Sequence, residues 1–109
     1  MKNLDIVWTS QFKKDYKAAM KRRLPIELLD DVIRSLARGE LLPDRNRDHA
    51  LLGRWRGYRE CHIQPDWLLI YRVEDTMLML TLARTGTHSD LFCLLYTSPS
   101  PRDRQKSRM

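Results

Sequence analysis

The chain has 109 residues, of which 20 are Lys or Arg and 14 are Asp or Glu; its formal net charge is +6, and 42% of its residues are hydrophobic. This composition excludes a wholly disordered chain and predicts one globular domain. The longest apolar run, residues 67–71, is far too short to span a membrane, and two cysteines are too few for a disulfide-rich secreted domain. We therefore expect a cytoplasmic protein without a membrane segment.

The first predicted element is a strand over residues 4–8, followed by a helix that Thr9 or Ser10 caps. Apolar residues then recur at helical spacing and define the face that we expect to be buried. These residues are Phe12, Tyr16, Ala19 and Met20. Lysines, among them Lys13 and Lys17, occupy the other side of the helix. That basic side is interpreted either as a solvated face or as a surface that contacts RNA.

A second helix is predicted after Pro25, because apolar residues recur at helical spacing over residues 26–36. Gly39 is expected to end it. The short connection between the two helices predicts a helical hairpin.

Residues 40–57 have no clear hydrophobic period and are expected to form a loop. Arg54 and Arg56 flank Trp55 in this loop. Basic groups beside an aromatic ring suit RNA binding, although a solvated loop held in place by one Trp accounts for the same residues.

After Gly57 the pattern changes to strands, which we predict over residues 58–63, 67–73 and 77–83. In the first of these, Cys61 should face the core and His62 should face away from it. The order of elements predicts an α+β fold: an N-terminal strand, a helix hairpin and an antiparallel sheet of three further strands.

The candidate chemical groups lie in the second half of the chain. The three histidines are His49, His62 and His88, and Asp66 and Arg84 are close to two of them in sequence. The histidine spacings of 13 and 26 do not match a zinc site, and Cys61 is expected to be a buried thiol, so we predict no metal and no cofactor. Imidazoles, a carboxylate and a guanidinium suit acid–base cleavage of RNA, whose 2′-hydroxyl is the nucleophile.

Two motifs then identify a resemblance. They are H-x-x-P-D-W at residues 62–67 and R-T-G-T-H at residues 84–88. Residues 48–72 and 84–92 closely resemble the YafQ branch of the RelE/ParE superfamily of bacterial toxins, and the resemblance extends over residues 1–92. It implies a RelE-like α+β fold and the toxin of a type II toxin–antitoxin module. The expected activity is metal-independent cleavage of mRNA in the ribosomal A site.

The same resemblance implies the partners: a small antitoxin of the ribbon-helix-helix type, the ribosome and mRNA, with operator DNA contacted only through the antitoxin complex. It also implies five catalytic or RNA-contacting positions, with Trp67 and Phe92 as supporting positions. The five positions are His49, His62, Asp66, Arg84 and His88.

We assign roles to these five residues as hypotheses. Arg84 would stabilise the charge that develops on phosphorus, and His88 would be the general acid. Asp66 or His62 would activate the 2′-hydroxyl. His49 would position the phosphate or share in proton transfer.

Two alternatives remain at this point. The chain could be a non-catalytic relative that binds only its antitoxin, or a basic RNA-binding module. The presence of all three histidines together with Asp66 and Arg84 argues against a pure binding protein, which has no need of the full set.

The last segment has a different character. Residues 93–109 carry a net charge of +3, contain Pro99 and Pro101, and lack apolar periodicity after Tyr96. Residues 93–103 resemble the translation of a transposase-type sequencing adapter. We therefore expect residues 1–92 to form the toxin domain and residues 93–109 to be an artefactual, disordered tail.

Overall fold

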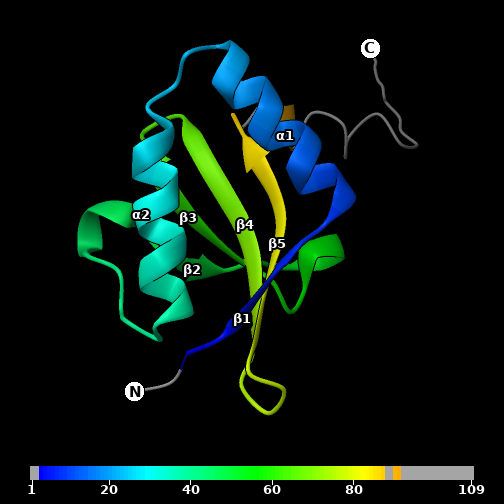
Figure 1. Cartoon of the computed structure of the whole chain (residues 1–109). Coiled ribbons are helices and arrows are strands. Elements are labelled where there is room, and N and C mark those ends of the chain that lie inside the picture. The colour runs from blue at the N-terminus through cyan, green and yellow to red at the C-terminus, as the bar shows by residue number, and fades with distance from the viewer. Residues whose placement is uncertain (1–2, 88–89, 92–109) are drawn as a thin grey trace.

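The computed structural model describes residues 3–87 and 90–91. The chain begins with strand β1 (Asp5–Trp8) and continues into helices α1 (Ser10–Lys21) and α2 (Ile26–Ala37). Two short 3₁₀ turns, η1 (Asp44–Asn46) and η2 (Gly53–Trp55), flank strand β2 (His49–Ala50). Strands β3 (Arg59–Gln64), β4 (Trp67–Glu74) and β5 (Met79–Gly86) complete the fold, which is shown in Figure 1. The predicted α+β class is confirmed.

Helix α1 begins where the sequence predicts. The hydroxyl of Thr9 accepts a hydrogen bond from the backbone N–H of Phe12 at 3.1 Å, which satisfies one of the donors left free at a helix start. Phe12 and Ala19 are buried. Met20, which the apolar spacing places on the buried side, is instead 54% exposed, because it lies about 100° around the helix from the buried Ala19, at the margin of the packed face.

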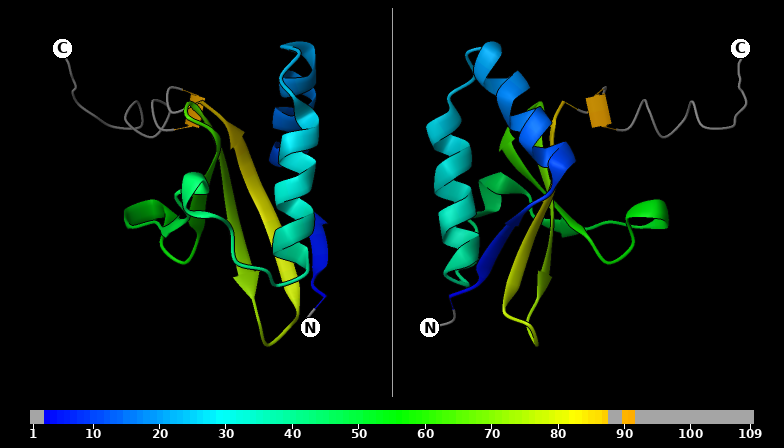
Figure 2. Two further views of the ribbon diagram at one scale, coloured as in Figure 1. Left: turned by 90° about the vertical axis from the view of Figure 1, so that its left-hand side faces the viewer. Right: turned by 45° about the vertical axis from the view of Figure 1, so that its right-hand side comes forward.

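Helix α2 buries Leu29, Ile33 and Leu36, as its hydrophobic spacing predicts. Gly39 adopts a left-handed conformation with φ 75° just after the helix, a geometry in which glycine is favoured. Figure 2 shows both helices covering one face of the sheet. None of the helices in the described part of the chain is long and apolar enough to cross a membrane.

The sheet has five strands in the order β1-β5-β4-β3-β2. The predicted three-stranded antiparallel part is present, and two features extend it. Strand β1 pairs in parallel with β5. The short strand β2 forms inside the predicted loop by pairing His49 with Glu60 and Ala50 with Arg59.

The core lies on both faces of the sheet. Leu69 and Tyr71 of β4 pack against the helices, and Leu68 and Ile70 of the same strand belong to a second, smaller cluster. Residues 51–58 cover this second cluster through partly buried side chains that include Trp55 and Tyr58. The sheet face opposite the helices is therefore partly apolar.

A bulge in β5 changes which of its residues face the helices. Ile70 pairs with Arg84, and the next residue of β4, Tyr71, pairs with Leu82, so Ala83 is an extra residue in the ladder. As a result Arg84 follows Ala83 on the face of Ile70, and Thr85 returns to the helix side. A regular strand would have placed Arg84 on the same side as Leu82, in the core.

Candidate active site

The strand register brings three of the predicted residues to one face of the sheet. Across the strands, His49 pairs with Glu60, Glu60 with Ile70, and Ile70 with Arg84. Paired residues of antiparallel strands project from the same face, so these positions form one row. His62 pairs with Leu68 in the neighbouring row. His49, His62 and Arg84 thus share the face opposite the helices.

Glu60 lies between the two histidines. Its side chain is only 5% exposed, and its Oε1 lies 3.3 Å from Nε2 of His49 and 3.9 Å from Nε2 of His62. The sequence predicts that Glu60 faces away from the helices, but it does not single out Glu60 as a site residue. The available signal is its position two residues before His62 on one strand, which places both side chains on the same face.

Both ring nitrogens of His49 face acceptors. Nδ1 donates to the backbone carbonyl of Arg47 at 2.8 Å, and Nε2 faces the Glu60 carboxylate. An imidazole satisfies both contacts when both of its nitrogens carry a proton. His49 is therefore arranged to act as a donor.

Asn46 fixes the backbone beside the second histidine. Its side-chain amide donates to the carbonyl oxygen of His62 at 2.7 Å. The His62 side chain is 14% exposed, so it reaches solvent at one edge while it contacts the buried carboxylate of Glu60.

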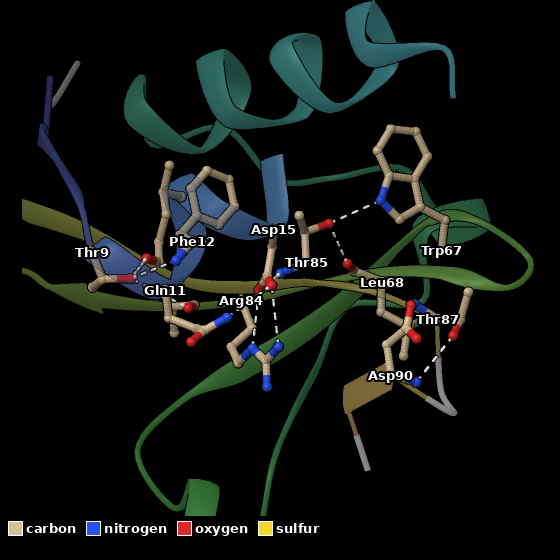
Figure 3. A network of polar contacts seen from close by, with 12 residues as sticks. Thr9, Gln11, Phe12, Asp15, Trp67, Leu68, Arg84, Thr85, Thr87 and Asp90 are labelled. Carbon is tan, nitrogen blue, oxygen red and sulfur yellow. Dashed lines mark hydrogen bonds and ion pairs between the residues drawn. The ribbon is translucent and has the colours of Figure 1, made fainter. Parts of the chain in front are cut away.

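Arg84 is bound by a carboxylate of α1. Its Nε and Nη2 donate to the two oxygens of Asp15 at 3.0 and 3.1 Å, and the backbone N–H of Thr85 donates to the same carboxylate at 3.2 Å. Figure 3 shows Arg84 and Thr85 leaving β5 on opposite sides, with Asp15 between them. The ion pair with Asp15 uses Nε and Nη2 of the guanidinium, so Nη1 is the nitrogen that does not contact this carboxylate.

Trp67 lies in the core instead of on the surface. It is 2% exposed, and its indole N–H donates to the hydroxyl of Thr85 at 2.9 Å, which in turn donates to the carbonyl of Leu68 at 2.7 Å (Figure 3). Trp67 is too buried to stack on a base, so its support of the site is indirect. Through its hydrogen bond, Trp67 holds Thr85, the residue that follows Arg84.

Asp66 lies in the turn between β3 and β4 and is exposed. His88 and Phe92 lie outside the described residues, and their assigned roles stay predictions. The described residues that flank this gap, Thr87 and Asp90, are joined to each other: Asp90 donates its backbone N–H to the hydroxyl of Thr87 at 3.1 Å, and Thr87 donates its own to the Asp90 carboxylate at 3.3 Å.

The four basic residues predicted to contact RNA, Lys13, Lys17, Arg54 and Arg56, are exposed, but they are not all near the histidines. Arg54 and Arg56 belong to the η2 segment, which Figure 2 shows projecting from the side opposite the helices. Lys13 and Lys17 lie two residues on either side of Asp15, about 200° around the helix from it. They therefore point away from the ion pair with Arg84. Trp55 packs edge-on against Tyr58, with ring centroids 5.4 Å apart.

Cys61 is fully buried and is a free thiol. Burial raises the pKa of this thiol far above its ordinary value, and the nearby carboxylates of Asp48 and Glu60 act in the same direction. This residue is arranged as part of the core. Within residues 3–87 and 90–91, no group of three or more His, Cys, Asp or Glu residues is placed to hold a metal ion.

Comparison with protein families matches residues 4–93 to the bacterial toxin of type II toxin–antitoxin systems, YafQ. The chain belongs to the YafQ toxin family. It is 43% identical over 89 residues to the mRNA interferase toxin YafQ of Escherichia coli strain K12, a match that covers 81% of this chain and 95% of that toxin.

Solved YafQ structures agree with this assignment. The crystal structure of YafQ from E. coli BL21(DE3) superposes with a TM-score of 0.77 at 41% identity, covering 83% of this chain and 99% of that one. YafQ in the E. coli DinJ–YafQ toxin–antitoxin complex gives a TM-score of 0.76 at 41% identity, covering 83% and 98%. As a member of the YafQ family, this chain is a toxin of a type II toxin–antitoxin system. The E. coli complex shows that relative bound to its antitoxin DinJ.

Proposed function

We propose that this YafQ-family toxin is an mRNA interferase, a ribosome-associated endoribonuclease that cleaves mRNA by acid–base catalysis without a metal or other cofactor. One observation carries the proposal: His49, Glu60, His62 and Arg84 project from the same face of one rigid sheet. The similarity to a relative named as an mRNA interferase supports the same activity.

The first step is attack by the RNA 2′-hydroxyl. His62 accepts the proton of this hydroxyl, and the 2′-oxygen forms a bond to the adjacent phosphorus. The Glu60 carboxylate, 3.9 Å from Nε2 of His62, stabilises the imidazolium that forms. The carboxylate of a Ser-His-Asp triad likewise stabilises the charged form of its histidine. Asp66, in the adjacent turn, is the other candidate base.

The second step is departure of the 5′-oxygen. The bond from phosphorus to this oxygen breaks, and His88 donates a proton to it, which leaves a 2′,3′-cyclic phosphate and a free 5′-hydroxyl. Arg84 stabilises the negative charge on the phosphoryl oxygens between the two steps. His49 would position the same group by exchanging the contact of its Nε2 with Glu60 for one with a phosphoryl oxygen, while its Nδ1 stays bonded to the carbonyl of Arg47.

The proposed cellular context follows from this activity. The toxin would act in the cytoplasm on ribosome-bound mRNA. Its antitoxin, of the ribbon-helix-helix type, would block it and would bring it to operator DNA only as a complex. Residues 1–92 would form the toxin domain, while residues 93–109, outside the described structure, would be dispensable for it.

The test is expression of the chain without an antitoxin, with growth and mRNA 5′ ends followed together. The wild-type chain should arrest growth and produce new mRNA ends within the ribosomal A site. His62→Ala and Arg84→Ala should each abolish the cuts while retaining antitoxin binding. Growth arrest that persists in both variants would contradict the mechanism, and antitoxin binding without any cleavage by the wild-type chain would indicate a non-catalytic binding protein.

A further inference from the structure

A pocket of about 300 Å³ opens beside His62. One wall comes from the segment around η1, namely Arg45, Asn46 and Arg47, and the other from residues 62–65 at the end of β3. His62 therefore belongs both to the sheet face that carries the candidate catalytic residues and to the wall of this pocket. A molecule bound in the pocket would lie directly beside the proposed general base.

The charge of this pocket differs from that of the other two described pockets. Between α1 and β5, Arg22 is paired with Asp90 and Arg84 with Asp15. In the pocket beneath the end of α2, Arg59 is paired with Asp48.

The pocket beside His62 is lined by two arginines, and no carboxylate in its lining neutralises their charge. Neither Arg45 nor Arg47 forms an ion pair with any other residue that the structure describes. No acidic residue is among those that line the pocket. Two exposed guanidinium groups next to each other without a facing carboxylate are an electrostatic site for an anion.

The segment that carries these arginines is held in a fixed position. The amide of Asn46, which is itself 7% exposed, donates to the carbonyl of His62, and the carbonyl of Arg47 accepts from His49. Arg47 has φ 49°, a left-handed conformation that side-chain-bearing residues rarely adopt and that surrounding contacts must maintain. Both candidate catalytic histidines are thus bonded to the segment that forms the pocket.

We infer that this pocket is a subsite for one nucleotide of the RNA strand next to the cleaved bond, with Arg45 and Arg47 binding its phosphate. The inference rests on the proposed function, because it names where the substrate strand of that reaction is held. The pocket volume is at the lower end of the range of roughly 300–1,000 Å³ for small-ligand sites, which suits one nucleotide. A guanidinium binds two phosphate oxygens at once, and the side chain of Gln64 offers an amide to the base.

The experiment compares Arg45→Gln, Arg47→Gln and the double variant with the wild-type chain. Arg23→Gln is the matched control, since Arg23 is also an exposed arginine at positive φ, 60°, but does not line the pocket. Binding is measured by fluorescence anisotropy over a range of salt concentrations. The probe is a short single-stranded oligoribonucleotide with 2′-O-methyl sugars, which lacks the nucleophile and is not cleaved.

The double variant should bind this probe about tenfold more weakly, and each substitution should reduce the slope of log affinity against log salt by roughly 0.7, the value per phosphate contact for single strands. Arg23→Gln should keep the wild-type slope. Titration with adenosine 5′-monophosphate should shift the backbone amide resonances of residues 45–47 and 62–64. Unchanged slopes in both single variants, or shifts confined to other residues, would overturn the inference.

Cleavage of mRNA on programmed ribosomes separates this inference from the proposed function. If both are right, the double variant raises KM with little change in kcat, because the subsite holds substrate and transition state alike. If the wild-type chain binds the probe through these arginines but cleaves nothing, the proposed function is wrong and the subsite stands. If the wild-type chain cleaves and the double variant has an unchanged KM, the subsite is wrong and the proposed function stands.

Discussion

The carboxylate of Glu60 lies 3.3 Å from Nε2 of His49, and the same oxygen lies 3.9 Å from Nε2 of His62. A single buried acidic side chain therefore contacts both histidines of the described site. Because Glu60 is almost completely removed from solvent, its charge acts on these two imidazoles with little screening. Glu60 is therefore placed to hold the two imidazoles relative to each other.

Glu60→Gln should reduce the kcat of mRNA cleavage about tenfold, the factor that corresponds to about 1.4 kcal/mol of lost electrostatic stabilisation of an imidazolium. Ribosome binding, measured by co-sedimentation, should be retained. Glu74→Gln is the matched control, since Glu74 belongs to the neighbouring strand and pairs with Arg72 away from the histidines. Equal kcat values for Glu60→Gln and the wild type would show that the carboxylate has no catalytic role.

Asp15→Asn should also reduce kcat, because the asparagine amide has one acceptor oxygen and no charge. It cannot accept from both Nε and Nη2 of Arg84 as the carboxylate does. We expect about a tenfold effect. The informative measurement is a double-mutant cycle with Arg84→Gln: if Asp15 acts through Arg84, adding Asp15→Asn to Arg84→Gln changes nothing further. Asp31→Asn, which alters an exposed ion pair with Arg34, is the control. Faster cleavage by Asp15→Asn would mean that Asp15 masks Arg84 instead of orienting it.

Cys61 should not react with a thiol reagent in the folded protein. Burial raises the pKa of this thiol, so the reactive thiolate is suppressed and the reagent has no access. In a Cys93→Ser background, labelling by dithionitrobenzoate at pH 8 should be absent from the native chain and complete in guanidinium chloride. Labelling of the native chain at the rate of a free peptide thiol would contradict the buried position of Cys61.

The contact between Arg22 and Asp90 should contribute a small, pH-dependent stability. The hydrogen bond from Arg22, at 2.9 Å, lowers the pKa of Asp90 below its ordinary value. A carboxyl group with a lowered pKa in the folded state stabilises the protein above its unfolded pKa of about 4, and this contribution is lost as the pH falls through the folded value.

Because both side chains are partly exposed, Asp90→Asn should cost only about 0.2–1 kcal/mol at pH 7. The difference between the variant and the wild type should disappear near pH 2. Denaturant unfolding at several pH values measures this, and a difference that grows on acidification would have the wrong sign for the contact described.

Much of the fold follows from local pattern. The Thr9 cap, the buried spacing of Leu29, Ile33 and Leu36, and the outward position of His62 are all predicted because each depends on residues close together in the chain. The prediction for Met20 is wrong, because helical spacing gives the direction of the buried face but not its width around the helix.

The site is less accessible to this kind of reasoning. The sequence by itself determined which residue types are present, the two motifs that carry the family resemblance, and the face on which His62 lies. The tertiary structure decided that Glu60 lies beside both histidines, because that contact depends on pairing between β2 and β3.

The tertiary structure also decided the position of Arg84. Alternation from Leu80 and Leu82 would direct this residue into the core, and the extra residue Ala83 moves it to the histidine face. The carboxylate that then holds Arg84 comes from Asp15, which is 69 residues away in the chain. Such contacts join segments that only the folded sheet and helix bring together, and no local sequence pattern specifies them.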